Sequence, residues 1–226
     1  MINRTFDRVL PAHVSEASSF QSAILADVAG RRGAANGRIR ALRPGMRLAG
    51  PALTVDVRPG DNLMIHAAIQ MAKPGDVLVI DGKGDLNSAL MGTLMFSACK
   101  QLGIAGVVID GATRDSAEIG ELGFPVFCVS TCPNGPTKNV GGRIGHRVSV
   151  GGVGVQSGDF VLADDDGVVF VEREALAGLI PLAHAKVADE AKRLQSIFRG
   201  DIAAPWLDKA LRDAGVLAAS ETLRPQ

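Results

Sequence analysis

Hydrophobic and polar positions along the chain predict alternating strands and helices. Residues 46–58, rich in leucine, valine and threonine, predict a strand, and residues 14–30 carry apolar positions at helical spacing. The turn at residues 59–62 is expected to open a helix from about residue 63 to 71. Residues 77–80 form an uninterrupted apolar run, which is typical of a strand buried on both faces.

The next stretch repeats itself. Val79-Ile80-Asp81-Gly82 returns 29 positions later as Val108-Ile109-Asp110-Gly111, with a helical pattern over about 92–102 in between. Strand, helix and strand in this order predict a right-handed crossover between parallel strands. Asp81 and Asp110 would then lie at the carboxyl ends of these strands, where open α/β sheets bind ligands.

After residue 130, the alternation of strands and helices gives way to short β runs. A short helix up to residue 122 and a buried strand over 125–130 are followed by four short β runs between 148 and 171, separated by glycine- and aspartate-rich turns. Residues 174–199 predict an amphipathic helix. We therefore expect one α/β domain over 1–226, with a core at about 20–200 and a C-terminal arm at about 201–226.

Composition and charge narrow the function. The 226 residues are 46% hydrophobic and 21% charged, and 24 basic residues balance 24 acidic ones. This is the composition of a globular domain, and the zero net charge gives no footprint for nucleic acid or an anionic membrane surface. No apolar run reaches the roughly 18 residues of a membrane helix, and residues 1–8 lack the apolar core of a signal peptide. The expected location is the cytoplasm.

Three cysteines do not form a disulfide framework. Cys128 and Cys132 could pair or bind a metal, but Cys128 lies in an apolar run, which favours a buried thiol. Gly152–Gly158 resembles a dinucleotide-binding loop but is followed by a strand, which favours β-turn glycines. His66 lies in the middle of a predicted helix. A core histidine is the favoured interpretation and a site residue the alternative.

The sharpest candidate chemistry follows the second copy of the repeat, in Asp110-Gly111-Ala112-Thr113-Arg114-Asp115. Arg114 offers a planar fork for a carboxylate or phosphate, and Asp115 offers hard oxygen ligands for Mg²⁺ or Mn²⁺. Taken alone, the pair favours a helix-capping aspartate beside a solvated arginine over a binding site. Backbone N–H groups near Leu94 and Met95, at a predicted helix N-terminus, could frame a carboxylate site together with Arg114.

Five sequence blocks resemble the RraA-like superfamily over roughly residues 20–200. They are Gly60-Asp61-Asn62 with His66, Pro74–Val79, Ala89-x-x-Gly92-x-Leu94, Gly106–Gly111 with Arg114-Asp115, and Gly158-Asp159 with Ala163–Val169. The resemblance implies a β/β/α swivelling-domain-like α/β fold with C-terminal helices. It also implies a homotrimeric ring, sometimes a hexamer, with active sites at subunit interfaces.

The superfamily includes metal-dependent class II 4-hydroxy-4-methyl-2-oxoglutarate/4-carboxy-4-hydroxy-2-oxoadipate aldolases, which also decarboxylate oxaloacetate, and a regulator of ribonuclease E. In the aldolase branch the matching arginine, Arg114, binds the pyruvyl group, and the matching aspartate, Asp115, holds Mg²⁺ or Mn²⁺ largely through waters. A glutamate from a neighbouring subunit, here Glu190, completes the water shell of the metal. The regulator branch lacks the aspartate, so Asp115 favours an enzyme.

The same resemblance places the pyruvate carboxylate on the backbone amides of Gly92, Leu94 and Met95. It also exposes a departure, because aldolases of this branch carry an acidic residue where this chain has Thr93. A threonine hydroxyl can position a water but does not act as a base near neutral pH.

The sequence thus predicts a divalent-metal-dependent lyase that cleaves or decarboxylates a small 2-oxo acid and leaves a pyruvate enolate. No lysine falls on the matched positions, so a Schiff base is not expected. The alternative is a non-catalytic trimer that regulates a ribonuclease or another protein partner. Asp115 and Glu190 favour the enzyme, and Thr93 favours the alternative.

Overall fold

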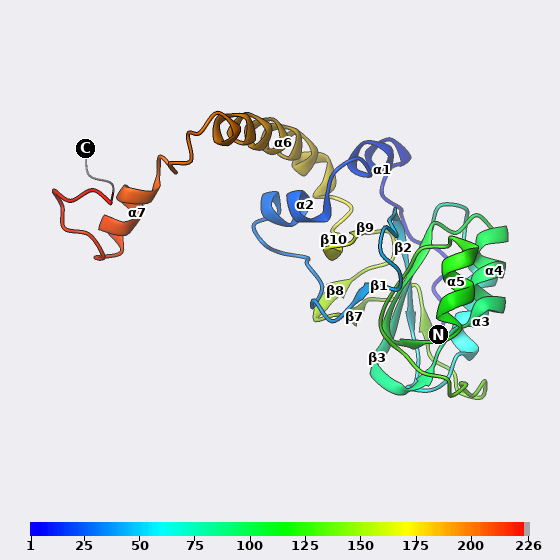
Figure 1. Ribbon diagram of the computed structural model, residues 1–226. Coiled ribbons are helices and arrows are strands. Elements are labelled where there is room, and N and C mark those ends of the chain that lie inside the picture. Colours follow the sequence, from blue (N-terminus) through cyan, green and yellow to red (C-terminus); the bar gives the residue numbers. More distant parts are fainter. Residues whose placement is uncertain (224–226) are drawn as a thin grey trace. The chain divides into compact units, whose positions relative to one another are not determined.

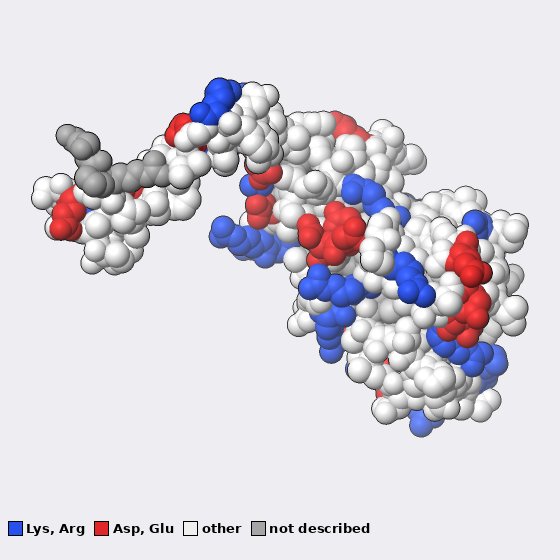
Figure 2. All heavy atoms as spheres, viewed as in Figure 1, with Lys and Arg blue, Asp and Glu red and all other residues white. Residues whose placement is uncertain are grey.

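The structure is a computed structural model that describes residues 1–223. The chain divides into two compact units, of which the first comprises Met1–His184 and the second begins at Ala185. Among the described residues, no helix is long and apolar enough to cross a membrane. On the face shown in Figure 2, basic and acidic side chains are interspersed, in keeping with the zero net charge.

An eight-stranded mixed sheet forms the centre of the first unit (Figure 1). Its four central strands are parallel, as the repeat predicts, and its outer strands pair antiparallel. In spatial order the strands are β1 (Arg40–Ala41), β5 (Val126–Thr131), β4 (Gly106–Thr113), β3 (Val77–Ala89), β2 (Leu48–Asp56), β9 (Phe160–Asp164) and β10 (Gly167–Val171). β6 (Arg143–Ile144) also pairs with β2, and β7 (Val148–Val150) and β8 (Val153–Val155) form a separate hairpin.

Three helices cover one face of the parallel strands: α3 (Leu63–Met71), α4 (Thr93–Gln101) and α5 (Ser116–Leu122) (Figure 1). They bury Ile65, Phe96 and Ile119 against alternate residues of the sheet, so this layer contains the largest apolar cluster. The predicted crossover is confirmed, because α4 connects β3 to the parallel strand β4.

The opposite face of the sheet packs against the β7–β8 hairpin, β9 and β10. A third apolar cluster joins β9 and β10 to α1 (Pro11–Ala17), α2 (Ser22–Val28) and the first turns of α6 (Leu176–Phe198), which bury Leu176, Ile180 and Ala183. The later part of α6 belongs to the second unit, together with α7 (Leu207–Asp213).

The single helix predicted over 14–30 is in fact two helices, α1 and α2. The Ser18 hydroxyl donates to the Ser15 carbonyl (2.8 Å) and the Ser19 hydroxyl to the Glu16 carbonyl (2.7 Å). Serine side chains that bond to nearby backbone groups compete with helical hydrogen bonds. The periodicity was correct on both sides of this break, but it carried no sign of the break itself.

β3 is longer than the predicted run of 77–80 and continues to Ala89, with shifts in its register to β4 after Ile80 and after Asp85. Lys83, just after the first shift, has the left-handed φ of +61°. Asp81 therefore lies inside the strand and not at its carboxyl end.

The expectation that Asp81 and Asp110 face a ligand is wrong. The Asp81 carboxylate accepts from Lys83 Nζ (2.6 Å) and from the Ser149 amide (3.3 Å). The Asp110 carboxylate accepts from the Arg38 guanidinium (2.6 Å) and the Gly151 amide (2.8 Å). Both buried carboxylates thus attach the β7–β8 region to the sheet, since a buried charge requires such partners.

All three cysteines are free, and the interpretation of Cys128 as a buried thiol is confirmed. Burial raises the pKa of the Cys99 and Cys128 thiols to about 12, so neither forms a reactive thiolate near neutral pH. Cys132 is partly exposed, and its thiol donates to the Asn87 carbonyl.

Phe96 offers a test of the helix-covered layer. It is fully buried against Phe124, with 6.0 Å between the ring centroids. Phe96→Ala should lower the free energy of unfolding by about 3–5 kcal/mol, because it removes the ring and leaves a cavity. Chemical denaturation monitored by circular dichroism measures this loss. The control Leu102→Ala, at a 43%-exposed position, should cost far less; equal losses would contradict the assigned core.

Candidate functional site

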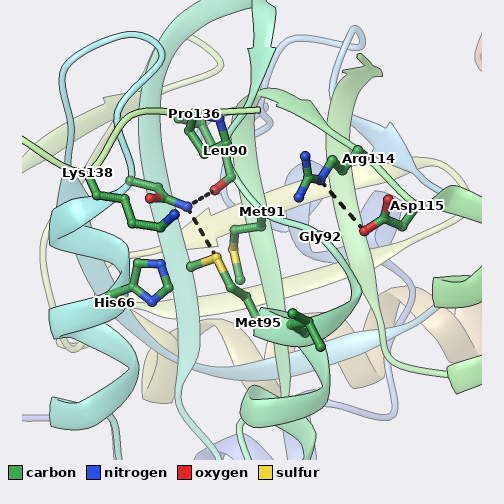
Figure 3. Close-up of a pocket in the computed structure, with 11 residues that line it drawn as sticks. His66, Leu90, Met91, Gly92, Met95, Arg114, Asp115, Pro136 and Lys138 are labelled. Carbon is green, nitrogen blue, oxygen red and sulfur yellow. Dashed lines mark hydrogen bonds and ion pairs between the residues drawn. The ribbon is translucent and has the colours of Figure 1, made fainter. Parts of the chain in front are cut away.

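A cavity of about 230 Å³ lies in the first unit, where β3 and β4 end and α3 and α4 begin (Figure 3). Its walls come from four separate stretches of the chain, which meet because adjacent parallel strands end at the same edge of the sheet. The lining residues are Asn62, His66, Leu90, Met91, Gly92, Leu94, Met95, Arg114, Asp115, Pro136 and Lys138.

One wall carries Arg114 and Asp115, directly after β4. The loop after β3 is tied to this position through the Met91 carbonyl, which accepts from the Thr113 hydroxyl (2.8 Å) and the Arg114 amide (3.1 Å). Arg114 Nε lies 3.8 Å from Asp115 Oδ2, and both side chains are partly exposed. The predicted pairing of a guanidinium and a carboxylate at a cavity wall is therefore present.

Asp115 also caps the helix across the loop. Its Oδ2 accepts from the Thr93 amide (2.9 Å), in the first turn of α4, and its backbone adopts the left-handed φ of +63°. Asparagine and aspartate tolerate this conformation better than most residues. The capping interpretation left open by the sequence is correct only in part, because Asp115 occupies the N-cap position of α5 without a side-chain cap bond there, and its carboxylate caps α4 instead.

Gly92 makes room for this arrangement. A Cβ atom at position 92 would overlap Asp115 Oδ2 and would lie 3.1 Å from Arg114 Nε. Its φ of −149° is ordinary extended backbone, so the requirement for glycine here is one of space and not of backbone conformation.

The backbone amides differ from the expected set. The Met95 amide donates to the Gly92 carbonyl (3.0 Å) and is not available to a ligand. The amides of Gly92 and Leu94 find no acceptor within the part of the chain that the structure describes, and both residues line the cavity. Two of the three expected amides remain for an anion at the start of α4.

Two further residues named from the sequence lie elsewhere. Thr93 does not line the cavity, and its hydroxyl is buried without a hydrogen-bond partner among residues 1–223. Its contribution to the site is therefore the backbone N–H that holds Asp115. Glu190 lies on α6 in the second unit, where its carboxylate pairs with Lys186 Nζ at 3.0 Å.

The opposite wall carries His66 and Lys138 (Figure 3). Asn62 also lines the cavity. None of the three is among the site residues favoured from the sequence. The favoured interpretation of His66 as a core histidine is wrong, because its side chain is exposed at the cavity. Asn62 and His66 are four residues apart and so share one helix face. That spacing was the available signal, whereas nothing local pointed to Lys138.

The electrostatics of this wall are set by its two basic groups. Partial burial of the imidazole, followed by the nearby Lys138 ammonium, lowers the pKa of His66 below its ordinary value of 6.5. His66 is therefore neutral at pH 7, and Lys138 provides the positive charge on this side.

Asn62 has an unused acceptor. Its side chain is 3% exposed, and its Nδ2 donates to the Leu90 carbonyl (2.9 Å) and to Met95 Sδ (3.3 Å). Its Oδ1 has no partner among the described residues. A buried acceptor without a partner is costly, so this oxygen favours a donor group on a molecule that enters the cavity.

Comparison with known proteins places this geometry in a family. The sequence profile of the RraA-like family, described as Aldolase/RraA, matches residues 11–170. The chain belongs to the RraA-like family. A relative from Halalkalibacterium halodurans, named "Putative 4-hydroxy-4-methyl-2-oxoglutarate aldolase", is 40% identical over 159 residues, which cover 70% of this chain and 76% of that protein.

Solved structures of other RraA-like proteins share the fold. The Streptomyces coelicolor protein RraAS2, described as an unusual member of the RNase ES inhibitor RraA family, is 29% identical with a TM-score of 0.76, over 83% of this chain and all of the other. The RNA-processing inhibitor RraA of a Thermus species is 29% identical with a TM-score of 0.62, over 67% and 92% of the two chains. The expected α/β fold is confirmed, and RraA-like proteins carry names from both an enzyme class and a regulator class.

The field of Lys138 at His66 can be measured directly. We expect the His66 imidazole to titrate below pH 6.5, and Lys138→Met to raise its pKa because the substitution removes the neighbouring positive charge. Nuclear magnetic resonance of the imidazole protons during a pH titration reports both values. Lys100→Met serves as control, since Lys100 donates to the Leu122 carbonyl outside the cavity. An unchanged His66 pKa in Lys138→Met would contradict the placement of Lys138.

Proposed function

We propose that this RraA-like protein is a divalent-metal-dependent lyase that cleaves or decarboxylates a 2-oxo acid to pyruvate. The observation that carries the proposal is the joint position of the Arg114 guanidinium and the Asp115 carboxylate on the wall of a small cavity, beside two amides that have no acceptor in the described structure. An anion-binding fork, a hard oxygen ligand and free N–H groups together suit a 2-oxo carboxylate held next to a metal ion.

The residues present fit a hydrated Mg²⁺ or Mn²⁺ ion. The described part of the chain has no cluster of three or more His, Cys, Asp or Glu side chains that could enclose a metal. Magnesium often keeps several waters and uses only one or two carboxylates, and Asp115 supplies one on the cavity wall. When bound there, the ion supplies Lewis acidity that polarises the 2-oxo group and stabilises an enolate.

The side chains of the protein hold the two ends of the substrate. Arg114 binds and orients the pyruvyl end, and the Gly92 and Leu94 amides donate hydrogen bonds to its carboxylate. Lys138 and His66, on the opposite wall, suit a second carboxylate. The arrangement therefore favours a dicarboxylic 2-oxo acid such as oxaloacetate or 4-hydroxy-4-methyl-2-oxoglutarate, the latter being the substrate in the name of the relatives.

We further propose assembly as a homotrimer or a hexamer, in which Glu190 of one subunit completes the water shell of the metal bound at Asp115 of the next. A heterologous ring allows each subunit to contribute to the site of its neighbour. Large apolar side chains exposed on the second unit, such as Phe198 (84%) and Trp206 (66%), support a contact with another chain.

A non-catalytic role as regulator of a ribonuclease or another protein partner is the second candidate. It is favoured by Thr93, whose hydroxyl is buried. Aldolases of the branch that this chain resembles carry an acidic residue at this position. The regulatory role is also in line with the described functions of the RNA-processing inhibitors that share the fold.

Pyruvate release distinguishes the two candidates. The protein should release pyruvate from oxaloacetate or from 4-hydroxy-4-methyl-2-oxoglutarate in the presence of Mg²⁺ or Mn²⁺, lose this activity with a chelator, and regain it when the metal returns. A lactate dehydrogenase-coupled assay measures the rate. Because Lys138 lines the cavity, borohydride should be added during turnover. A reduced pyruvate adduct on a lysine would refute the metal mechanism, and no pyruvate from either substrate would favour the regulator.

Arg114→Lys tests the anion fork. Lysine keeps the charge but loses the planar bidentate geometry, so kcat/KM should fall by about 2–4 kcal/mol in transition-state stabilisation, comparable to the loss of one oxyanion donor. Arg43→Lys is a matched control, because Arg43 is exposed and, within the described part of the chain, its side chain donates only to the Ser116 carbonyl. Near-normal turnover of Arg114→Lys with the metal still bound would show that Arg114 is not the substrate clamp.

Thr93→Asp tests the departure from the aldolases. Retro-aldol cleavage needs a base for the substrate hydroxyl, whereas decarboxylation of oxaloacetate does not. The native protein should therefore decarboxylate oxaloacetate faster than it cleaves the hydroxy acid, and Thr93→Asp should raise cleavage relative to decarboxylation. Both rates are measured at one metal concentration, with Thr93→Asn as a control of similar size that cannot act as a base. If all three proteins give the same ratio, a carboxylate at position 93 has no part in proton transfer.

A further inference from the structure

The buried carboxylate of Asp61 connects the two segments that form the wall opposite Arg114. One segment is the start of α3, with Asn62 and His66, and the other carries Lys138. Asp61 is 1% exposed. Its Oδ1 accepts from the Leu63 amide at the start of α3 (3.0 Å), and its Oδ2 accepts from the Thr137 hydroxyl (2.6 Å), the Asn139 amide (2.8 Å) and the Val140 amide (3.2 Å). One carboxylate thus joins the N-terminus of a helix to a segment 76 residues further along the chain.

These hydrogen bonds surround Lys138 in the sequence, since the residues before and after it both donate to Asp61. Two backbone bonds reinforce the junction, from the Thr137 amide to the Gly60 carbonyl (2.8 Å) and from the Asn62 amide to the Thr137 carbonyl (3.0 Å). Lys138 makes no hydrogen bond or ion pair of its own within the described chain, and its side chain reaches into the cavity (Figure 3). Its position is therefore determined by the backbone on either side of it.

The same carboxylate also fixes the segment that carries Asn62 and His66. α3 begins next to Asp61 and carries His66, and Asn62 adjoins Asp61 in the chain. Burial alone would raise the pKa of Asp61, but the hydrogen bonds from Thr137 and from the backbone amides lower it to about 2. The group is thus a permanent anion with four donors, and its charge strengthens each of those bonds.

We propose that Asp61 is a positioning residue that holds Lys138 beside His66 and thereby sets the affinity of the cavity for the distal carboxylate of its substrate. The identity of that ligand rests on the proposed function, whereas the placement of Lys138 by Asp61 does not. No contact between Asp61 and the cavity itself is involved, because Asp61 is not among the lining residues.

Asp61→Asn removes the carboxylate that positions Lys138 with little change in the shape of the side chain. The amide of asparagine has one oxygen and one NH₂ group. If the oxygen faces the Leu63 amide, the NH₂ group faces the donors at Asn139 and Val140, and their bonds are lost. If the oxygen faces the segment, the helix cap is lost. Either orientation loosens the junction that Asp61 makes.

The first measurement is the coupling between Lys138 and His66 in the metal-free protein. The His66 pKa is determined by nuclear magnetic resonance in the wild type, Lys138→Met, Asp61→Asn and the double variant. Lys138→Met should raise the pKa in the wild-type background and should produce less than half of that shift in the Asp61→Asn background. The charge of Asp61 is absent from both Asp61→Asn and the double variant, so its direct effect on the His66 pKa cancels when these two proteins are compared. Equal shifts in both backgrounds would overturn the proposal.

The second measurement separates the two ends of the cavity. Asp61→Asn should raise the KM for oxaloacetate at least fivefold, while exchange of the pyruvate methyl protons into D₂O, which requires only the Arg114 end, should stay within twofold of the wild type. Equal losses in both reactions would mean that Asp61 has only a structural role. If the wild type supports neither reaction, the proposed function fails, and the His66 coupling still decides the role of Asp61.

Two further variants separate the effect of Asp61 on Lys138 from a general loss of stability. Asp76→Asn is the matched control, because Asp76 is a buried carboxylate that accepts from the Lys73 amide (2.8 Å) and from Arg8 away from the cavity. It should lower stability without changing the His66 coupling or the ratio of the two reactions. Should Asp61→Asn fail to fold, Thr137→Val removes the hydroxyl bonds from this exposed position to the Asp61 carboxylate (2.6 Å) and the Gly60 carbonyl (3.3 Å) and leaves the backbone bonds in place. It should reduce the same coupling in the same direction, and an unchanged coupling would overturn the proposal.

Discussion

The wall of the cavity that carries Arg114 and Asp115 depends on one charged hydrogen bond, from the Thr93 amide to the Asp115 carboxylate. It crosses from the end of β4 to the first turn of α4, and it fixes the loop that separates β3 from α4. Asp115 can reach across because its backbone is left-handed, at a cost of order 1–3 kcal/mol for a residue other than glycine, and because Gly92 has no Cβ in the way. The Asp115 carboxylate and the amides at the start of α4 are therefore positioned by the same contact.

Asp115 and Arg114 therefore differ in how far the local structure depends on them. Asp115 holds the local structure and also presents a carboxylate oxygen to the cavity, so its removal would disturb the loop together with any chemistry. The Arg114 guanidinium makes no hydrogen bond to the described chain, and its only close charged partner is Asp115 at 3.8 Å. Its side chain is thus available to a ligand, which is why the arginine, and not the aspartate, gives the cleaner test of substrate binding.

Half of the site could be predicted from the sequence, because it follows from local patterns. The repeated strand end, the crossover helix and the Arg114-Asp115 pair lie on consecutive elements, and the ends of adjacent parallel strands must meet. The wall formed by His66 and Lys138 could not be predicted in the same way. Lys138 lies in a segment without periodicity, and its place depends on bonds to Asp61 that connect positions far apart in the chain.

Buried charge explains the other errors. Asp81 and Asp110 occupy equivalent places in the repeat, and the repeat alone made them look like ligand-binding groups. In the structure each has its own basic partner, Lys83 or Arg38, and each also accepts an amide from the β7–β8 region. Sequence periodicity reports that a position is buried. It does not report whether a buried carboxylate has a partner within the protein or waits for one from outside.

Charge balance also bears on the choice between enzyme and regulator, which the fold leaves open because RraA-like proteins carry names of both kinds. Arg114 and Lys138 bring two positive charges to a cavity of about 230 Å³, and Asp115 brings one negative charge. A divalent cation at Asp115 would raise this excess further, and a dianionic substrate would offset it. A small concave site with convergent charged groups suits a small anion better than the surface of a protein partner, which requires a broad contact area. This concentration of charge in the first unit is the physical basis on which the proposal of a small dicarboxylate substrate stands.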